Sequence, residues 1–583
     1  MPPRKRQAKQ AVASSRPKRG KKDDNSKKDD ANDDAKQSAG KGKKTKNTAT
    51  VKPDVKFKKE NTKVKQEPDS KASSSEEKAD IKKLTFSGSV PVDEHCAECS
   101  SGYHVYIDQK QNCIYNAMLN QTNIGFNNNK YYILQILKQD TQPQYVTWFR
   151  WGRVGKIAGT AIKRHGGDLY AAKNTFKKKF RDKTGNIWSS PSFIKILGKY
   201  DLLEMDYGED TKDDKKKVDD EKKKKREEVE SKLDKRLQEV IDLIFDVKEF
   251  EACVKELEFD VKKAPLGKLT SKQIKAGYET LKKIEKCHQE NKYGRELADA
   301  CSEFYTRIPH DFGMKVPPLI RTPAQLKLKI QLLEALSDIQ IAIQMMDEDD
   351  DKTDDVNIKD LHYQSLDCKL EPLDKTHDEY KMVKTYVSNS HGSTHNQYAL
   401  DLENVYKVER EGEEQRFKKD IGNRMLLWHG SRLTNWCGIL KQGLRIAPPE
   451  APSTGYMFGK GVYFADMISK SANYCHANHR QPSGFLLLCE VALGNTNDKT
   501  HADYDANKLP KGKHSTKGLG REEPDPQGYH TMDCGTLAPL GKPKAVSDNT
   551  NRYLMYNEYI VYDVAQIRAR YLVKAKFKYK SHW

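Results

Sequence analysis

Three short motifs in the last third of the chain contain residue types that bind or catalyse. They are Leu427-Trp428-His429-Gly430-Ser431, Gly459-Lys460-Gly461-Val462-Tyr463-Phe464-Ala465-Asp466 and Tyr556-Asn557-Glu558-Tyr559-Ile560. A histidine donates or accepts hydrogen bonds, a tyrosine offers a flat ring, and a glutamate supplies negative charge. Each motif alone is more typical of a structural position: a loop hydrogen bond, a packed ring or a solvent-facing strand residue.

Together and in this order, the three motifs resemble the His-Tyr-Glu signature of the poly(ADP-ribose) polymerase family. The segments between them are similar as well: residues 442–452 resemble the family's donor-site loop, and residues 469–475 resemble the helix that lines its nicotinamide pocket. Residues 512–520 are a further similar stretch, and the resemblance extends from about Gly102 to the last residue. It implies an enzyme that cleaves NAD, releases nicotinamide and transfers ADP-ribose to proteins and to growing chains, without a metal.

The resemblance implies a role for each residue of the signature. Cleavage of the nicotinamide–ribose bond passes through an oxocarbenium-like cation, so the site must hold the leaving group, grip the ribose and place negative charge nearby. Glu558 would stabilise that cation and orient the attacking hydroxyl, and His429 would hydrogen-bond the adenine-side ribose. With Tyr463 they form the implied catalytic set.

The same resemblance implies a wider set of residues that bind NAD. The backbone of Gly430 and the hydroxyl of Ser471 would hold the nicotinamide amide, while Tyr463 and Tyr474 would sandwich the ring. Arg445 would serve the adenosine–pyrophosphate end. The full implied set is His429, Gly430, Ser431, Gly438, Arg445, Tyr463, Ser471 and Tyr474.

The tripeptide Trp151-Gly152-Arg153 points to DNA. With Asn127-Asn128-Asn129-Lys130-Tyr131-Tyr132 before it, this region resembles the family's Trp-Gly-Arg domain, which reads a DNA end through its phosphates and its terminal base. Lys130 and Arg153 suit phosphate, and Trp151 suits stacking on an exposed base or ribose. We therefore expect Asn129, Lys130, Trp151 and Arg153 to contact DNA that carries strand breaks.

Residues 266–270 and 304–313 resemble the family's helical regulatory domain. That resemblance implies autoinhibition, in which folded helices shield the NAD pocket until DNA loosens them. A plain packing bundle is the alternative.

The elements that must position these motifs are visible as patterns. Residues 131–137 and 145–151 predict neighbouring strands with a turn near 140–143, and residues 171–180 have helical spacing. Thr322, Pro323 and Gln325 predict an N-cap and capping box for a helix that reaches about Met346. One face of an earlier helix is indicated by Leu233, Leu237, Val240, Ile241, Ile244 and Val247. Residues 485–491 and 559–562 predict strands.

These patterns predict a multidomain chain. We expect a disordered basic tail over residues 1–85 and a small α/β Trp-Gly-Arg domain over 88–207. A charged linker over 208–230 would lead to an all-α helical regulatory bundle over 231–350. An α+β ADP-ribosyltransferase catalytic domain would follow over 361–583.

The charge distribution favours nucleic acid as a partner. The formal net charge is +20, and residues 1–80 contain 24 Lys and Arg against 13 Asp and Glu. A basic arm releases counterions when it meets phosphate, although a merely solubilising tail is the alternative. The clusters Arg4-Lys5-Arg6 and Arg16 to Lys22 resemble a nuclear import signal, so we expect a nuclear protein.

The cysteines predict an intracellular protein with reduced thiols. Eleven cysteines in 583 residues are too few and too scattered for a disulfide framework. Cys96, Cys99, His104 and Cys113 have irregular spacing, which argues against a zinc site. No apolar run approaches the ~20 residues of a membrane span.

Several alternatives remain open. A mono-ADP-ribosyltransferase, or a DNA-end-binding scaffold with a dead catalytic domain, would share most of these features. We expect the acceptors to be chromatin proteins and the chain itself. The chain ends in Trp583, which either folds back on the domain or, as the resemblance implies, docks a histone-associated factor that redirects modification to serine. His582 stands where similar chains carry Leu, so an apolar contact is missing there.

Overall fold

The computed structural model describes residues 90–111, 113–154, 156–190, 192–196, 198–205, 229–259, 261, 269–350, 355–548 and 550–580. The basic tail with its import-like clusters, most of the charged linker and the terminal Trp583 lie outside the described residues. None of the described helices is both long enough and apolar enough to cross a bilayer.

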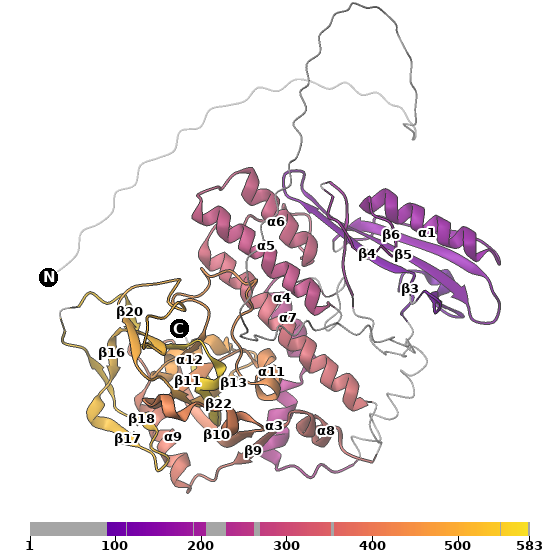
Figure 1. Ribbon diagram of the computed structural model, residues 1–583. Helices are drawn as coiled ribbons and strands as arrows, with labels where there is room; N and C mark the ends of the chain where they lie inside the picture. Colours follow the sequence, from indigo (N-terminus) through magenta and orange to yellow (C-terminus); the bar gives the residue numbers. More distant parts are fainter. Residues whose placement is uncertain are drawn as a thin grey trace, which may run out of the picture. The chain divides into compact units, whose positions relative to one another are not determined.

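The first folded region is a twisted sheet with one long helix (Figure 1). Its strand order is β7-β6-β5-β4-β8, and β1 pairs with β5. The strands are β1 (Tyr103–Val105), β4 (Asn116–Asn123), β5 (Asn128–Gln139), β6 (Tyr145–Arg153), β7 (Gly159–Arg164) and β8 (Asp201–Leu202), beside a small pair β2 (Ile107–Asp108) and β3 (Cys113–Ile114). The two strands predicted from 131–137 and 145–151 are therefore confirmed as β5 and β6.

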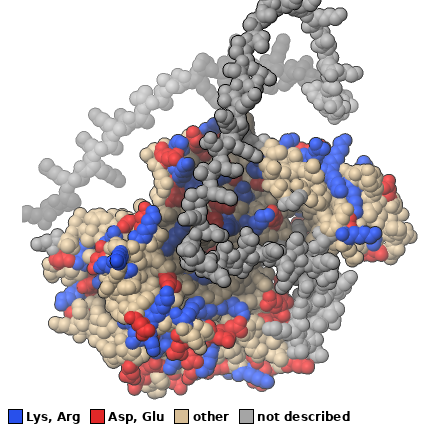
Figure 2. Space-filling model, viewed as in Figure 1, with Lys and Arg blue, Asp and Glu red and all other residues tan. Residues whose placement is uncertain are grey.

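Helix α1 (Leu169–Thr184) confirms the helical spacing seen at 171–180. Asp168 caps its first turn by accepting a hydrogen bond from Ala171 N, and Gly185 ends it in the left-handed conformation at φ +77°. Its apolar side packs on one face of the sheet, with Phe176 and Phe180 fully buried. The opposite side of α1 carries Lys and Arg side chains, and basic side chains gather over this region in Figure 2.

The middle region is helical. It contains α3 (Lys235–Ile244), α4 (Val247–Glu256), α5 (Ser271–Gln289), α6 (Arg295–Arg307), α7 (Pro323–Asp350) and α8 (Ile358–Ser365). The capping box is confirmed: Thr322 Oγ1 accepts from Gln325 N at 3.2 Å, and Gln325 Oε1 accepts from Thr322 N at 3.1 Å. The helix that follows continues to Asp350, four residues beyond the predicted end.

One expectation for this region was wrong. The apolar positions from Leu233 to Val247 do not share one helix, because Leu233 precedes α3 and Asp246 separates α3 from a second helix. The Asp246 carboxylate accepts from Lys248 N and Glu249 N, which caps a new helix, α4, at Val247. Val247 consequently starts the next helix with a partly exposed side chain and does not extend the buried face of α3.

The last region is built on three sheets. The largest has the order β17-β18-β11-β13-β22-β10-β9, the second β12-β21-β15-β14 and the third β19-β16-β20. The strands of the largest sheet are β9 (Cys368–Pro372), β10 (Tyr398–Arg410), β11 (Arg424–Gly430), β13 (Ser483–Ala492), β17 (Tyr529–Thr531), β18 (Leu537–Pro539) and β22 (Ile567–Tyr579). The other two contain β12 (Val462–Phe464), β14 (Thr496–Lys499), β15 (Ser515–Gly518), β16 (Gly520–Pro524), β19 (Pro543–Ala545), β20 (Leu554–Tyr556) and β21 (Glu558–Val561).

Short helices complete this region: α9 (Asp378–Asn389), α10 (Glu413–Arg416), α11 (Trp436–Gln442) and α12 (Ile468–Ala472). The strand predicted from 485–491 is confirmed within β13, and the strand predicted from 559–562 is confirmed as β21, which ends one residue earlier at Val561. One apolar cluster continues from the helical region into this one and includes Leu333 of α7, Trp436 of α11 and Leu427 of β11. The helical region is therefore packed directly on the sheets that carry the three motifs.

Candidate active site

Strand β11 places His429 next to Tyr463. The strand pairs with β13, and an isolated bridge between Trp428 and Ala465 brings the segment of β12 alongside it. The Nδ1–H of His429 donates to the backbone oxygen of Tyr463 at 2.9 Å, and burial lowers the pKa of the imidazole. His429 is therefore neutral near pH 7, and its Nε2 is an acceptor for a hydroxyl group.

Gly430 and Ser471 are in close backbone contact. A Cβ on Gly430 would clash with the backbone oxygen of Ser471, so only glycine allows this approach of β11 to α12. The Ser471 hydroxyl donates to the Trp428 oxygen at 2.9 Å. Ser431 lies beside them, and its Oγ accepts from Asn435 Nδ2 at 2.9 Å. The structure thus brings together the two residues expected at the nicotinamide amide, Gly430 and Ser471, with Ser431 of the wider NAD-binding set next to Gly430.

The two expected ring-stacking tyrosines differ in their surroundings. Tyr463 is held from both sides, because its hydroxyl donates to Gly459 O at 2.7 Å and accepts from Phe458 N at 2.9 Å. Burial raises the pKa of the Tyr463 hydroxyl, and the nearby Glu558 charge adds to the rise. Tyr474 is 43% exposed, and the ammonium of Lys327 from α7 lies 5.2 Å from its ring centre. A residue of the helical region thus covers part of the expected nicotinamide site.

Glu558 begins β21, which pairs with β12 through Tyr463 and Ile560. Its Oε1 forms an ion pair with Lys470 Nζ at 3.0 Å, and Lys470 also donates to Tyr556 O at 2.7 Å. The other carboxylate oxygen, Oε2, is buried and has no hydrogen-bond partner among the described residues. A buried acceptor of this kind is costly to leave unpaired, which fits an oxygen reserved for a substrate hydroxyl.

Lys470 is a residue that the sequence reasoning passed over. Burial lowers its pKa, and the neighbouring Glu558 carboxylate opposes that effect. The only signal in the sequence was its place inside the segment 469–475, where a lysine between two serines is usually exposed.

The strand that carries Glu558 is fixed from its opposite face. Asn557 Nδ2 and the Tyr559 hydroxyl donate to the same buried Asp466 oxygen, at 2.8 Å and 3.0 Å. Burial raises the pKa of Asp466. Because side chains alternate along a strand, this anchoring of residues 557 and 559 directs Glu558 to the other face, toward Lys470.

Arg445, expected at the adenosine–pyrophosphate end of NAD, and Gly438, another residue of the expected NAD-binding set, both contact Asp338 of α7. Arg445 forms an ion pair with the Asp338 carboxylate, and burial lowers the pKa of the guanidinium. A Cβ on Gly438 would lie 2.5 Å from Asp338 Oδ1. The neighbouring Glu334, also on α7, accepts from the Tyr456 hydroxyl at 2.8 Å, and the Tyr456 ring centre lies 6.3 Å from that of Tyr463.

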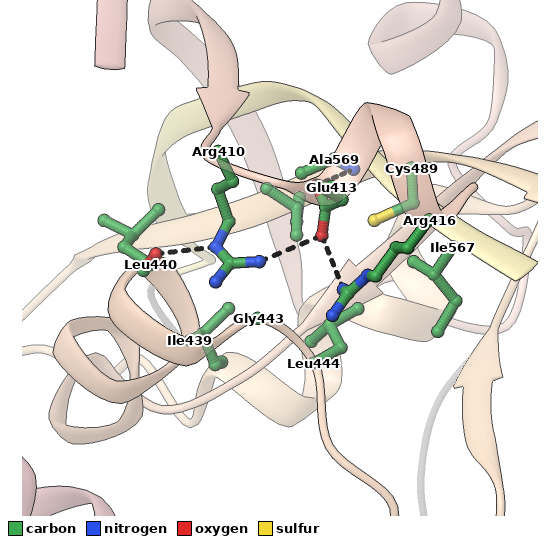
Figure 3. Close-up of a pocket in the computed structure, with 11 residues that line it drawn as sticks. Arg410, Glu413, Arg416, Ile439, Leu440, Gly443, Leu444, Cys489, Ile567 and Ala569 are labelled. Carbon is green, nitrogen blue, oxygen red and sulfur yellow. Dashed lines mark hydrogen bonds and ion pairs between the residues drawn. The ribbon is translucent and has the colours of Figure 1, made fainter. Parts of the chain in front are cut away.

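A small pocket lies beside the loop that leads to Arg445 (Figure 3). Arg410 donates to Leu440 O at 2.8 Å and to Lys441 O at 2.9 Å, and both Arg410 and Arg416 bind the buried Glu413 carboxylate at 3.1 Å. Gly443 turns there at φ +82°, with Arg410 only 2.7 Å from where a Cβ would lie. These contacts of Arg410 fix the path of residues 440–444. None of the expected NAD-binding residues lines the pocket.

The four expected DNA contacts fall into two groups. Asn129 is 1% exposed and donates to His310 O at 2.9 Å, and Arg153 donates to the oxygens of Gly313 and Lys315, each at 2.7 Å. These two side chains therefore join the first region to the helical region. Lys130 and Trp151 do not take part in this junction.

Trp151 and Lys130 lie on neighbouring strands. The Trp151 ring is stacked on Tyr132, with centres 5.7 Å apart and planes 10° apart, and the backbone at Gly159 packs against it. Lys130 is the register partner of Arg153, and its ammonium lies 5.6 Å from the Tyr200 ring centre.

The cysteine-rich segment does not converge on a cation. Within the described residues, no group of three or more His, Cys, Asp and Glu side chains is placed to hold a metal ion. Cys96 and Cys99 share one turn, whereas Cys113 contacts Ser189 and Trp188, and His104 pairs with Asp140.

Three family models match the chain in order. Residues 115–193 match the WGR domain, residues 231–363 match the regulatory domain of poly(ADP-ribose) polymerase, and residues 377–577 match the poly(ADP-ribose) polymerase catalytic domain.

Individual relatives are similar over most of the chain. The human protein named poly [ADP-ribose] polymerase 2 is 49% identical over 506 residues, which is 86% of each chain. Poly [ADP-ribose] polymerase 2-A of Oryza sativa is 47% identical over 515 residues, covering 86% of this chain and 77% of that one. Poly [ADP-ribose] polymerase 1 of Danio rerio is 43% identical over 507 residues, 86% of this chain but 48% of its own length.

Proposed function

This chain belongs to the poly(ADP-ribose) polymerase family, and from that premise we propose a DNA-break-activated enzyme of DNA repair that transfers ADP-ribose from NAD to proteins and to growing chains. NAD is its substrate. The observation that carries the proposal is the Glu558 carboxylate, with one oxygen paired to Lys470 and the other buried and unpaired among the described residues. It lies on a strand next to Tyr463, which in turn accepts the hydrogen bond of His429.

The proposed roles follow from these contacts. When the bond between the ribose C1′ and the nicotinamide nitrogen breaks, the bonding electrons leave with nicotinamide and the ribose becomes cationic. Glu558 supplies the opposing charge, and its free oxygen accepts a hydrogen bond from a ribose hydroxyl or from the attacking group. His429, neutral and protonated on Nδ1, accepts a hydroxyl hydrogen at Nε2. Tyr463 packs against the nicotinamide ring, and Gly430 with Ser471 holds its amide.

We propose that the helical region inhibits this site until DNA binds. Asp338 is paired with Arg445, and Lys327 covers the Tyr474 ring, so two side chains of α7 occupy opposite ends of the proposed NAD site. NAD binding therefore requires these contacts to break. Arg153 and Asn129 link the DNA-reading region to residues 310–315, shortly before α7 begins, which supports transmission along this route.

Finer assignments remain proposals. We propose domains over 88–207, 231–350 and 361–583, which the matched ranges 115–193, 231–363 and 377–577 support. The basic clusters before residue 23 support a nuclear location. We also propose that the chain and chromatin proteins are acceptors, and that Trp583 docks a histone-associated factor. Support for the last point is the position of Trp583 shortly after Tyr579, where β22 ends.

The test is incubation of the purified chain with labelled NAD and nicked circular DNA, intact circular DNA or no DNA, followed by gel separation. We expect long polymer in the reaction with nicked DNA and none in the other two reactions. A single ADP-ribose per acceptor would indicate a mono-ADP-ribosyltransferase, and DNA binding without any product would indicate a scaffold. Equal activity in all three reactions would contradict activation by breaks.

A further inference from the structure

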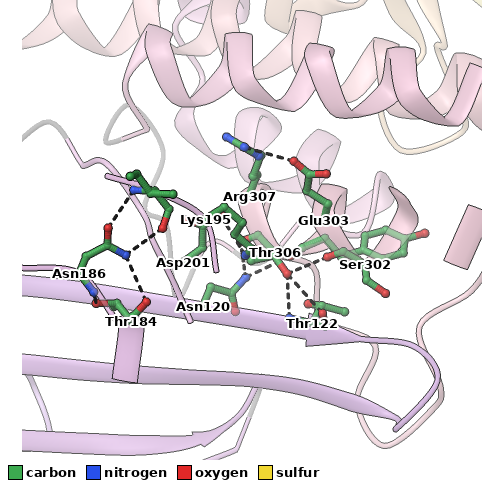
Figure 4. Close-up of polar contacts among 12 residues, drawn as sticks. Asn120, Thr122, Thr184, Asn186, Lys195, Asp201, Ser302, Glu303, Thr306 and Arg307 are labelled. Carbon is green, nitrogen blue, oxygen red and sulfur yellow. Dashed lines mark hydrogen bonds and ion pairs between the residues drawn. The ribbon is translucent and has the colours of Figure 1, made fainter. Parts of the chain in front are cut away.

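Arg153 joins two loops that are far apart in the sequence. Its guanidinium donates to Asn127 O at 2.6 Å in the turn between β4 and β5, and to Gly313 O and Lys315 O at 2.7 Å in the loop after α6. Further hydrogen bonds hold β4 against α6 beside it: Asn120 Nδ2 donates to Thr306 O at 2.9 Å, and Thr122 N to Thr306 Oγ1 at 2.9 Å (Figure 4). The two loops are thus fixed next to each other.

Each carbonyl that Arg153 binds is next in sequence to an exposed apolar side chain. Phe126 precedes Asn127 and is 80% exposed. Met314 and Val316 flank Lys315 and are 63% and 53% exposed. We take these three exposed apolar side chains, each next in sequence to a backbone group that Arg153 binds, as one patch at the junction of the first and helical regions. Such clustering marks a binding surface, whereas scattered exposed apolar residues do not.

The charges around this patch favour an anionic occupant. Lys130 stands opposite Arg153 in the β5–β6 register, and Lys315 is exposed between Met314 and Val316. The one acid of the loop, Asp311, is also exposed and its carboxylate accepts from Gly313 N at 2.8 Å, so the two lysines outnumber it. A ligand with a flat apolar face and flanking negative charges matches this arrangement, which is the chemistry of a base pair with its phosphates.

Trp151 is poorly placed to receive that base pair. One of its faces is stacked on Tyr132, and the backbone at Gly159 packs against the ring. Phe126, at the tip of a turn closed by the hydrogen bond from Asn127 N to Ile124 O at 3.1 Å, has a ring that is open to solvent. The exposed aromatic ring beside Arg153 is therefore Phe126.

We infer that Phe126, Met314 and Val316 form a binding site for the terminal base pair at a DNA break, with Lys130 and Lys315 against its phosphates. The inference rests on the proposed DNA-dependent function and adds a direct contact between the DNA end and the helical region. A seated end presses on residues 313–316, which lead to α7 and its inhibitory Asp338 and Lys327. The same contact that binds the DNA end would then also displace the segment that leads to the inhibitory helix α7.

The experiment uses the full chain and two short duplexes, one with free blunt ends and one of equal length closed at both ends by hairpin loops. Affinity and NAD consumption are measured for wild type, Phe126→Ala, Phe126→Tyr and Met314→Ser/Val316→Ser. Tyr170→Ala is the matched control, because Tyr170 is a 76% exposed aromatic residue on α1. Loss of one base–aromatic contact predicts that Phe126→Ala weakens binding to the blunt duplex by about 5-fold or more.

The expected pattern is specific. Phe126→Ala and Met314→Ser/Val316→Ser lose affinity and stimulation with the blunt duplex but bind the closed duplex as wild type does, whereas Phe126→Tyr and Tyr170→Ala keep both. If the wild type responds to the blunt duplex and the patch variants respond equally, the inference is wrong while the proposed function stands. If the wild type ignores the blunt duplex here and also ignores nicked circular DNA in the labelled-NAD assay above, both are wrong.

Discussion

Asp338 of α7 is ion-paired with Arg445 of the catalytic region, and its carboxylate also closes the space above Gly438. Both contacted residues belong to the set expected to bind NAD, and Arg445 was expected at its adenosine–pyrophosphate end. A single acidic side chain of the helical region therefore stands against two parts of the same proposed site. This relationship makes inhibition testable by changing one residue, without removing a domain.

Asp338→Ala should raise activity in the absence of DNA. The change frees Arg445 for the pyrophosphate and opens the space at Gly438, so the KM for NAD should fall by about 5-fold, equivalent to ~1 kcal/mol of binding. Steady-state NAD consumption without DNA measures this. Asp378→Ala is the control, since Asp378 is also ion-paired, to Lys381, but lies on the exposed side of α9. Unchanged DNA-free kinetics for Asp338→Ala would remove this contact from the inhibitory mechanism.

Glu558→Gln should abolish polymer while NAD binding survives. The amide keeps the shape of the side chain but loses the charge that supports the ribose cation, and such electrostatic stabilisation accounts for about 10²–10³ in rate. Product length on a gel and NAD binding by calorimetry separate the two effects. Glu409→Gln, on the exposed part of β10, should behave as wild type. Polymer of normal length from Glu558→Gln would exclude this carboxylate from the chemistry.

Sequence patterns predicted the local structure better than the contacts between regions. The capping box at Thr322 and strands β5, β6, β13 and β21 depend on periodicity and on neighbouring residues, so they could be predicted from the sequence. Asp338 lies on α7 more than a hundred residues before Arg445, and nothing in the helix pattern distinguishes it from a solvent-facing position. Asn129 likewise is a residue type that often contacts DNA. It is a buried hydrogen-bond donor between the two regions only because α6 and the loop after it pack against it.

The stability of the catalytic region should decrease in mild acid because of His476. Burial and the nearby Arg432 lower the pKa of His476 to about 4, whereas a histidine in an unfolded chain titrates near ~6.5. The unfolded state therefore takes up a proton that the folded state refuses. The free energy of unfolding is then unaffected above about pH 6.5 and falls as the pH drops from there toward about 4.

Urea unfolding at about pH 7.5 and about pH 5 measures this dependence. His476→Asn should flatten it, because asparagine does not titrate and tolerates the left-handed backbone at φ +49°. His530→Asn, at an exposed position on β17, should leave the dependence as in the wild type. If both variants lose stability with falling pH as steeply as the wild type, His476 is not the titrating group.

Removing residues 1–80 should weaken DNA binding without changing the preference for breaks. The tail carries 24 Lys and Arg against 13 Asp and Glu, so its loss reduces the counterions released on binding and flattens the salt dependence. Preference for nicked over intact DNA should survive, since that selection is proposed for Lys130, Arg153 and the patch of Phe126, Met314 and Val316. Binding measured over a range of salt concentrations gives both quantities. Loss of the preference on truncation, with Arg153→Ala unaffected, would assign break recognition to the tail.

Deleting Trp583 should abolish factor-stimulated serine modification while automodification on acidic residues continues. Trp583 follows Tyr579, where β22 ends, by four positions in the sequence, and a large aromatic side chain suits docking into a pocket of a partner. His582→Leu supplies an apolar neighbour to Trp583, so it should strengthen stimulation at limiting factor. The measurement is mass-spectrometric site mapping with purified chain, DNA, NAD and a graded amount of the factor. Equal serine modification by the wild type, the truncated chain and His582→Leu at limiting factor would show that Trp583 only packs against its own domain.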